Sequence, residues 1–66
     1  MKASINGCLR ELPDGLTVGA LLDLLGSVRK GIAVACNERV VRRAEFETQR
    51  LAEGDRVEII EAVAGG

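Results

Sequence analysis

The sequence predicts an α+β fold in which one main helix packs on one face of a mixed sheet of four to five strands. The chain opens with two short strand-like runs joined by Asn6-Gly7, a dipeptide typical of a tight hairpin turn. Apolar residues then recur at helical spacing over residues 18–25, as on one face of an amphipathic helix. Further strand-like runs follow at residues 32–37, 40–41 and 56–60.

The composition indicates one small globular domain. The chain has 66 residues, of which 47% are hydrophobic, and this length is near the lower limit for a domain that folds around a single core. No apolar run approaches the roughly 20 residues that cross a bilayer, and the first residues lack the apolar stretch of a secretory signal. We therefore expect a cytoplasmic protein that does not bind membranes.

Charge and aromatic content argue against nucleic acid as a partner. The net charge is −1, from 9 basic and 10 acidic side chains, so no strong positive field attracts phosphates. The basic cluster at residues 39–43 is followed at once by Glu45 and Glu47, which is typical of a solvated surface. Phe46 is the single aromatic residue, whereas proteins that bind single strands usually stack bases on several aromatic rings.

The first element should be a β-hairpin with strands at residues 1–5 and 8–12. A two-residue hairpin turn of the favoured type needs positive φ at both central positions, and Asn followed by Gly adopts this conformation at the lowest cost. Pro13-Asp14-Gly15 follows the second strand, and these residue types favour a turn that ends it.

The next element should be a short helix that begins after Thr17. A threonine hydroxyl at this position can accept a hydrogen bond from a backbone N–H of the first turn. Val18, Leu21, Leu22 and Leu25 have the i, i+3, i+4, i+7 spacing of one helix face. Gly26 is placed to end the helix in a left-handed conformation. Because so short a helix is not stable alone, it must pack on the sheet.

The second half of the chain supplies the remaining strands. In the run 32–37, Ile32, Val34 and Cys36 should point to one face, with Ala33 and Ala35 on the other. Three further elements are expected after it: a partner strand at 40–41, a turn or single helical turn over 43–49, and a tight turn at 53–55 that leads into the last strand at 56–60. This order of elements predicts a β-grasp, the ubiquitin-like architecture, with another α+β sandwich as the alternative.

The residues do not build an obvious enzyme. The chain contains no His, which removes the commonest general base and metal ligand, and its glycines form no phosphate-binding loop. Cys8 and Cys36 are distant in sequence and form no CxxC motif, so we expect buried or edge thiols, with a disulfide or a functional thiol as less favoured alternatives. We expect no bound cofactor or metal, and a protein on which other enzymes act.

The last strand leads toward a segment of unusual composition. Val57 and Ile59 share the core face, while Ile60 lies on the opposite, solvated face. The same alternation would place Glu61 on the core side, where an unpaired carboxylate is costly, so the strand should leave the sheet at about Glu61. This divides the chain into a domain at 1–61 and a flexible arm at 62–66, composed of Ala, Val and Gly. Glycine permits close approach to another surface, which suits insertion into a partner; a frayed end is the alternative.

The whole chain resembles the small sulfur carrier proteins of thiamine biosynthesis, the ThiS type. The resemblance rests on short motifs spread along the sequence. They are Ile5-Asn6-Gly7, Leu12-Pro13-Asp14-Gly15, Thr17-Val18 before Leu21-Leu22, Ile32-Ala33-Val34-Ala35 with Asn37, Val40-Val41, and Gly54-Asp55-Arg56-Val57-Glu58-Ile59 before the terminal Ala64-Gly65-Gly66.

This resemblance implies a function and a set of partners. An E1-like adenylyltransferase of the ThiF type would use ATP and Mg²⁺ to adenylate the carboxylate of Gly66. Sulfur from a cysteine desulfurase persulfide would then leave a thiocarboxylate on Gly66, for delivery to a thiazole synthase of the ThiG type. Val63, Ala64 and Gly65 would enter the partner's active site. The chain itself would contribute no catalytic group.

A docking surface and three alternative functions complete the predictions. Ile60, Ala33 and Ala35 are expected to form a docking patch on the open face of the sheet, although scattered surface apolar residues would look the same in sequence. The alternative functions are the small subunit of molybdopterin synthase, a ubiquitin-like protein modifier, and a β-grasp interaction or RNA-binding module.

Overall fold

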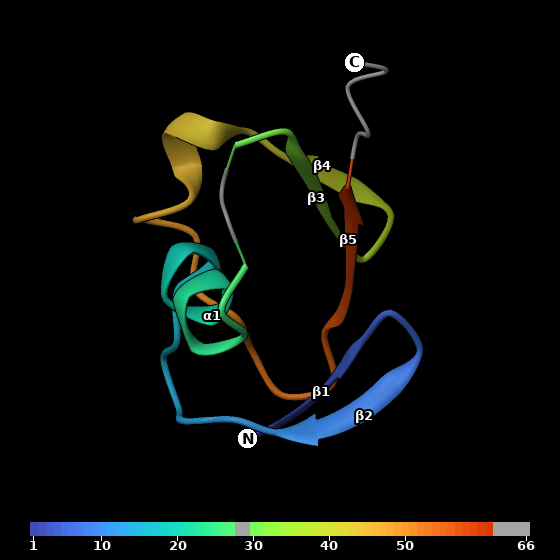
Figure 1. Cartoon of the computed structure of the whole chain (residues 1–66). Coiled ribbons are helices and arrows are strands. Elements are labelled where there is room, and N and C mark those ends of the chain that lie inside the picture. The colour runs from blue at the N-terminus through green and yellow to red at the C-terminus, as the bar shows by residue number, and fades with distance from the viewer. Residues whose placement is uncertain (28–29, 62–66) are drawn as a thin grey trace.

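The computed structural model describes residues 1–27 and 30–61, and Figure 1 shows the main helix, α1, on one side of a curved sheet. The elements, in chain order, are β1 (Lys2–Ile5), β2 (Cys8–Glu11), α1 (Val18–Leu24), β3 (Ile32–Cys36), β4 (Arg39–Val41), the 3-10 helix η1 (Arg43–Glu45) and β5 (Arg56–Glu61). The five strands form one sheet in the order β2-β1-β5-β3-β4. β1 and β5 are parallel, and the other neighbouring pairs are antiparallel. The predicted mixed sheet is confirmed.

Two hairpin turns with positive φ connect β1 to β2 and β3 to β4. Asn6 and Gly7, between β1 and β2, have φ values of 52° and 82°, as the sequence predicted. Asn37 and Glu38, between β3 and β4, have φ values of 53° and 67°. Asparagine tolerates this conformation because its short polar side chain can bond to nearby backbone.

Helix α1 begins and ends as its sequence predicts. The Thr17 hydroxyl accepts a hydrogen bond from the Ala20 backbone N–H at 3.1 Å. Beyond the helix, Gly26 has a φ of 71°, and the N–H of Ser27 donates to the carbonyl of Leu22 at 2.9 Å. This bond, together with the left-handed glycine, is the helix-ending arrangement that satisfies carbonyls of the last turn.

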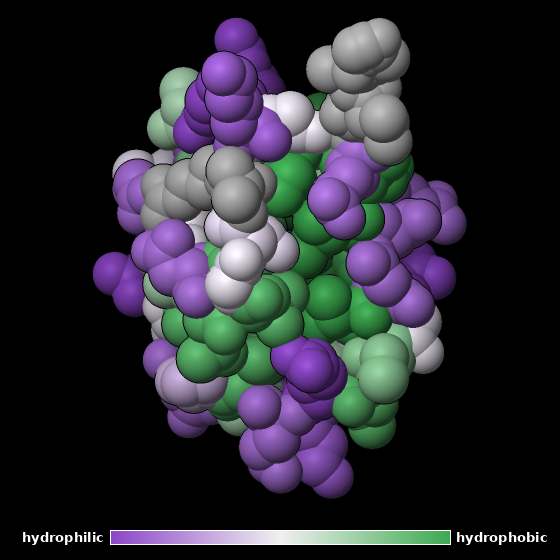
Figure 2. Space-filling view, viewed as in Figure 1, coloured by the Kyte–Doolittle hydropathy of each residue, from purple (hydrophilic) through white to green (hydrophobic). Residues whose placement is uncertain are grey.

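The core lies between α1 and the helix-facing side of the sheet. Val18, Leu21 and Leu22 of the predicted helix face are fully buried, and Leu25 packs against the cluster while partly exposed. The other buried apolar residues are Ala3, Ile5, Leu12, Val34, Cys36, Val41, Phe46, Leu51 and Val57. Figure 2 shows apolar surface around the helix, framed by hydrophilic side chains. Within residues 1–27 and 30–61, no helix has the length and apolar character of a membrane span.

The segment after β4 packs against the start of α1. The Gly19 N–H donates to the Phe46 carbonyl at 2.8 Å, and the Val18 N–H donates to the Gln49 carbonyl at 3.0 Å. The sequence predicted only a turn or helical turn here. These long-range bonds use N–H groups that a helix leaves unpaired in its first turn, and Phe46 and Leu51 fill the core beside them.

Strand β5 extends one residue beyond the predicted 56–60. Glu61 pairs with Ile32 of β3, and its side chain is exposed. The predicted cost of burying this carboxylate therefore does not arise, and the backbone can stay in the sheet through residue 61. The predicted arm at 62–66 lies outside the described residues.

Candidate functional site

The strand that leads to the predicted arm is the middle strand of the sheet. β5 lies between β1, which it follows in parallel, and β3, which it pairs in antiparallel register from Cys36↔Val57 to Ile32↔Glu61. β5 therefore has a neighbouring strand on each side, β1 as far as Val57 and β3 as far as Glu61. The three residues expected to enter a partner, Val63, Ala64 and Gly65, lie outside the described residues, as does Gly66, the residue expected to be modified.

The structure brings together the three residues of the predicted docking patch. Ala33 lies directly opposite Ile60, and Ala35, two residues further along β3, lies opposite Glu58. Their neighbours Val34 and Cys36 are buried in the core, so the alternation along the strand places the alanines on the face away from α1. Ile60 is 56% exposed. The predicted grouping of these residues is therefore present in the fold.

Val40 belongs to the same surface and was missed in the sequence. It lies opposite Ala35 on β4 and is 72% exposed. The signal that could have found it is the Val40-Val41 pair, because in a strand only one of two adjacent residues can face the core. We define the open-face patch as Ala33, Ala35, Val40 and Ile60.

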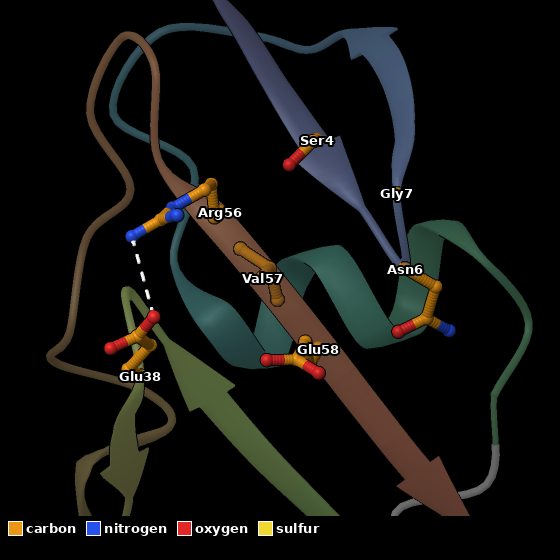
Figure 3. A pocket seen from close by; sticks show the side chains of 7 residues that line it. All are labelled: Ser4, Asn6, Gly7, Glu38, Arg56, Val57 and Glu58. Carbon is orange, nitrogen blue, oxygen red and sulfur yellow. Dashed lines mark ion pairs between the residues drawn. The ribbon is translucent and has the colours of Figure 1, made fainter.

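Next to the open-face patch, a hollow of about 450 Å³ lies across β5. Ser4, Asn6, Arg56 and Glu58 are among the residues that line it, and Figure 3 shows them around the strand with α1 behind. One Nη atom of Arg56 lies 3.9 Å from a carboxylate oxygen of Glu38, with both side chains largely exposed. An ion pair in this setting contributes little stability, and both charged groups remain accessible to solvent.

Two asparagines that turn the hairpins also hold β5. The Oδ1 atom of Asn6 accepts a hydrogen bond from the Ile59 N–H at 2.8 Å. The Oδ1 atom of Asn37 accepts one from the Arg56 N–H at 2.9 Å, and its Nδ2 donates to Asp55 at 2.9 Å. The sequence predicted a role for Asn6 only in the turn, because no local pattern links it to residue 59.

The two cysteines are free and differ in environment. Cys8 is exposed at the start of β2, whereas Cys36 is buried at the end of β3. Burial raises the pKa of the Cys36 thiol above its usual value of 9.0, and the nearby Asp55 carboxylate raises it further. The expected buried and edge thiols are confirmed, and no disulfide links them.

We expect iodoacetamide to label Cys8 but not Cys36 in the folded protein at pH 8, because the thiolate is the reactive form. Mass spectrometry should find one label before denaturation and two afterwards. Rapid double labelling of the native protein would contradict the burial of Cys36.

The raised pKa of Cys36 also affects stability at high pH. Because folding favours the protonated thiol, the stabilisation from burying Cys36 is complete below about pH 9 and falls as the pH rises above it.

The described residues do not bring together a metal site. Within 1–27 and 30–61, no group of three or more Cys, Asp or Glu side chains could hold an ion. The features of this part of the chain that could serve recognition are the open-face patch, the hollow beside it and the end of β5.

Comparison with known proteins places this architecture in a family. The model of the ThiS family matches residues 3–66. The chain is 29% identical to the sulfur carrier protein ThiS of Escherichia coli over 66 residues, which cover 100% of both chains. It is 36% identical to the sulfur carrier protein ThiS of Thermus thermophilus, over 94% of this chain and 95% of that protein.

A larger relative contains a matching segment. The chain is 35% identical over its whole length to part of a thiazole synthase from Paramagnetospirillum magneticum, and it spans only 20% of that protein.

The solved structures agree with the sequence matches. The crystal structure of the thiamine biosynthesis protein ThiS from Geobacter metallireducens superposes with a TM-score of 0.86, at 28% identity and 100% coverage of both chains. The solution structure of a thiamine biosynthesis protein from the same organism gives a TM-score of 0.81, also at 28% identity, over 100% of this chain and 88% of that one. The resemblance predicted from the sequence is thus confirmed: the chain belongs to the ThiS family and has a ubiquitin-like β-grasp fold.

Proposed function

We propose that this chain is a sulfur carrier protein of thiamine biosynthesis that carries sulfur as a thiocarboxylate on Gly66. The observation that carries the proposal is that the family match runs through residue 66, while the middle strand of the sheet leads directly into that segment. The described domain supplies recognition surfaces, and the chain has no His for acid–base catalysis. The chemistry is therefore assigned to partner enzymes.

The proposed reaction begins with activation of the carboxylate. An E1-like partner of the ThiF type would bind ATP and Mg²⁺. An oxygen of the Gly66 carboxylate attacks the α-phosphorus of this ATP, and pyrophosphate leaves. The product is a mixed anhydride with AMP. The carrier contributes the nucleophilic oxygen and the arm that brings it to ATP, and binding in a fixed geometry supplies most of the advantage over free reactants.

Sulfur then replaces AMP. The terminal sulfur of a persulfide, formed with a cysteine desulfurase, attacks the Gly66 carbonyl carbon and expels AMP. A second thiol cleaves the resulting acyl disulfide by thiol–disulfide exchange, which releases the thiocarboxylate and leaves a disulfide on the donor side. Exposed thiolate is intrinsically a strong nucleophile at neutral pH, which suits a step that must outcompete water.

A thiazole synthase of the ThiG type is the proposed sulfur acceptor. This part of the proposal is supported by the segment of a protein named thiazole synthase that matches the whole of this chain. The small subunit of molybdopterin synthase would use the same thiocarboxylate. It is the less favoured candidate because the named relatives and structures belong to thiamine biosynthesis.

Intact-mass measurement tests the proposed function. The protein is incubated with ATP, Mg²⁺, an E1-like enzyme and a persulfide donor, and we expect the mass to rise by the replacement of one oxygen with sulfur. Omission of ATP is the control. An unchanged mass with the complete mixture would contradict the proposal, and attachment to a lysine of another protein would identify a modifier instead. Transfer of the sulfur to thiazole synthase, but not to a molybdopterin synthase large subunit, should separate the two pathways.

The open-face patch is proposed as the surface that docks on these partners. Replacing Ile60 by Ser should weaken binding to the E1-like enzyme about fivefold or more, since a central apolar contact is worth over about 1 kcal/mol in an interface. Titration calorimetry measures the Kd. Leu24→Ser is a matched control, because Leu24 is 58% exposed and Ile60 56% exposed, but Leu24 lies on α1. Equal effects of the two substitutions would contradict docking through the sheet face.

A further inference from the structure

Strand β5 is paired over a greater length with β3 on one side than with β1 on the other. On one side, β3 pairs with it as far as Ile32↔Glu61. On the other side, β1 pairs only through Ser4↔Arg56 and Ile5↔Val57. The chain leaves β1 at Asn6, where φ becomes positive. The last residues of β5 therefore have no strand beside them on the β1 side.

The side chain of Asn6 extends the β1–β5 ladder at this point. The backbone N–H of Asn6 donates to the Val57 carbonyl at 2.8 Å, as in a regular parallel ladder. The next bond is made by the side chain, whose Oδ1 accepts from the Ile59 N–H at 2.8 Å. Figure 3 shows the Asn6 oxygen directed toward β5 and its nitrogen directed away. Asn6 thus replaces the missing strand for one further residue.

Ile59 directly precedes two features that the proposed function uses. Its neighbour Ile60 is part of the open-face patch, and Glu61 is the last described residue before the segment 62–66. On the β1 side, the bond from the Ile59 amide to Asn6 is therefore the hydrogen bond nearest to both features, while β3 holds Ile60 and Glu61 from the other side. Both features must be correctly placed at once if a partner binds the sheet face and the arm together.

We propose that Asn6 is a positioning residue, whose side chain holds the end of β5 in the orientation that the activating enzyme recognises. This inference rests on the proposed function, because it concerns how Gly66 is presented to that enzyme. Asn6 touches neither ATP nor the reacting carboxylate in this proposal. It acts through the Ile59 amide.

Two substitutions at position 6 separate the hydrogen bond from the turn. Asn6→Gly keeps the turn, because glycine adopts positive φ freely and Gly-Gly is a favoured hairpin dipeptide, but it removes the acceptor. Asn6→Asp keeps both an oxygen acceptor and a residue that tolerates this turn. A role of Asn6 in the turn alone predicts that the two variants behave alike.

Asn37→Gly is the matched control for stability. Asn37 has nearly the same φ as Asn6, 53° against 52°, and its side chain also accepts a hydrogen bond from β5. Its partner is Arg56, the first residue of the strand, so it holds the end remote from the arm. Because Asn37 also donates to Asp55, its loss should destabilise the domain at least as much as the loss of Asn6.

The experiment measures steady-state adenylation of the full chain by the E1-like enzyme, followed as ATP–pyrophosphate exchange, together with amide hydrogen exchange at Ile59. For Asn6→Gly we expect the KM for the carrier to rise about two- to tenfold, the range set by one hydrogen bond, with kcat unchanged. Ile59 should exchange faster by a similar factor. Asn6→Asp should restore both values, and Asn37→Gly should lower the Tm without raising KM.

The possible failures point to different conclusions. An Asn6→Gly protein with wild-type KM, or an equal rise in KM for Asn37→Gly, would overturn the inference. Wild-type exchange at Ile59 in Asn6→Gly would overturn it whatever the enzyme assay shows. If the wild-type chain is never adenylated, the proposed function fails. Faster exchange at Ile59 in Asn6→Gly would then show only that the Asn6 side chain stabilises the end of β5, with no role in presentation to the enzyme.

Discussion

Deletion of Gly66 should reduce thiocarboxylate formation at least about 100-fold and leave the stability of the domain unchanged. The shortened chain still ends in a glycine carboxylate, so its chemistry is the same and only its reach differs. One residue of extended chain spans about 3.3–3.6 Å, whereas displacing a reacting group by about 1 Å can already cost 100-fold in rate. Intact mass after a timed incubation with the enzyme, ATP and sulfur donor measures the loss.

Addition of one alanine after Gly66 is the complementary variant. It converts the Gly66 carboxylate into an amide and moves the terminal carboxylate outward by one residue, so it should also prevent activation. Neither change removes one of the buried core residues of the described part of the chain, which run from Ala3 to Val57, so we expect the Tm of both variants to equal that of the parent. Full activity of either variant would exclude Gly66 as the sulfur-bearing residue, and loss of the fold would show that residues 62–66 support the domain.

Leu22→Ala should destabilise the domain by about 2–5 kcal/mol, the usual cost of such a truncation in a core. Leu22 is fully buried on the helix face that packs against the sheet. A chain of 66 residues has a total stability of only about 3–10 kcal/mol, at the usual value per residue. The substitution should therefore remove a large part of the total stability of the domain. Urea denaturation followed by circular dichroism measures the change in the free energy of unfolding.

Leu24→Ala makes the same chemical change two residues further along α1. Because Leu24 is 58% exposed, its truncation should alter the free energy of unfolding by less than about 0.5 kcal/mol. The difference between the two variants isolates burial from helix propensity, since both replace leucine with alanine in one helix. Equal effects would mean that α1 does not pack on the sheet through the face that contains Leu22.

Local signals in the sequence were sufficient to predict the elements that depend on residues close together in the chain. The turn at Asn6-Gly7 depends on the φ preferences of two residues, and α1 depends on a cap at Thr17, one apolar face and a glycine after its end. The choice of face in β3 also depends only on alternation along the strand. All of these predictions are confirmed because each depends on residues within a few positions of one another.

The docking patch was predictable in part for the same reason. Alternation along single strands was enough to place Ala33, Ala35 and Ile60 on the open face. The membership of Val40 depends on its pairing with Ala35, which no local pattern encodes. Phe46 was visible as the one aromatic residue, but its burial depends on the return of its segment to the start of α1.

The sequence by itself determined the β-grasp order of elements, the family resemblance and the prediction of a functional arm after β5. The tertiary structure decided that β5 continues through Glu61 and that Asn6 holds Ile59, 53 positions away. The physical reason is the parallel pairing of β1 with β5. It joins the first strand to the last, and contacts between residues so far apart follow from the assembled sheet and cannot be found in any short stretch of sequence.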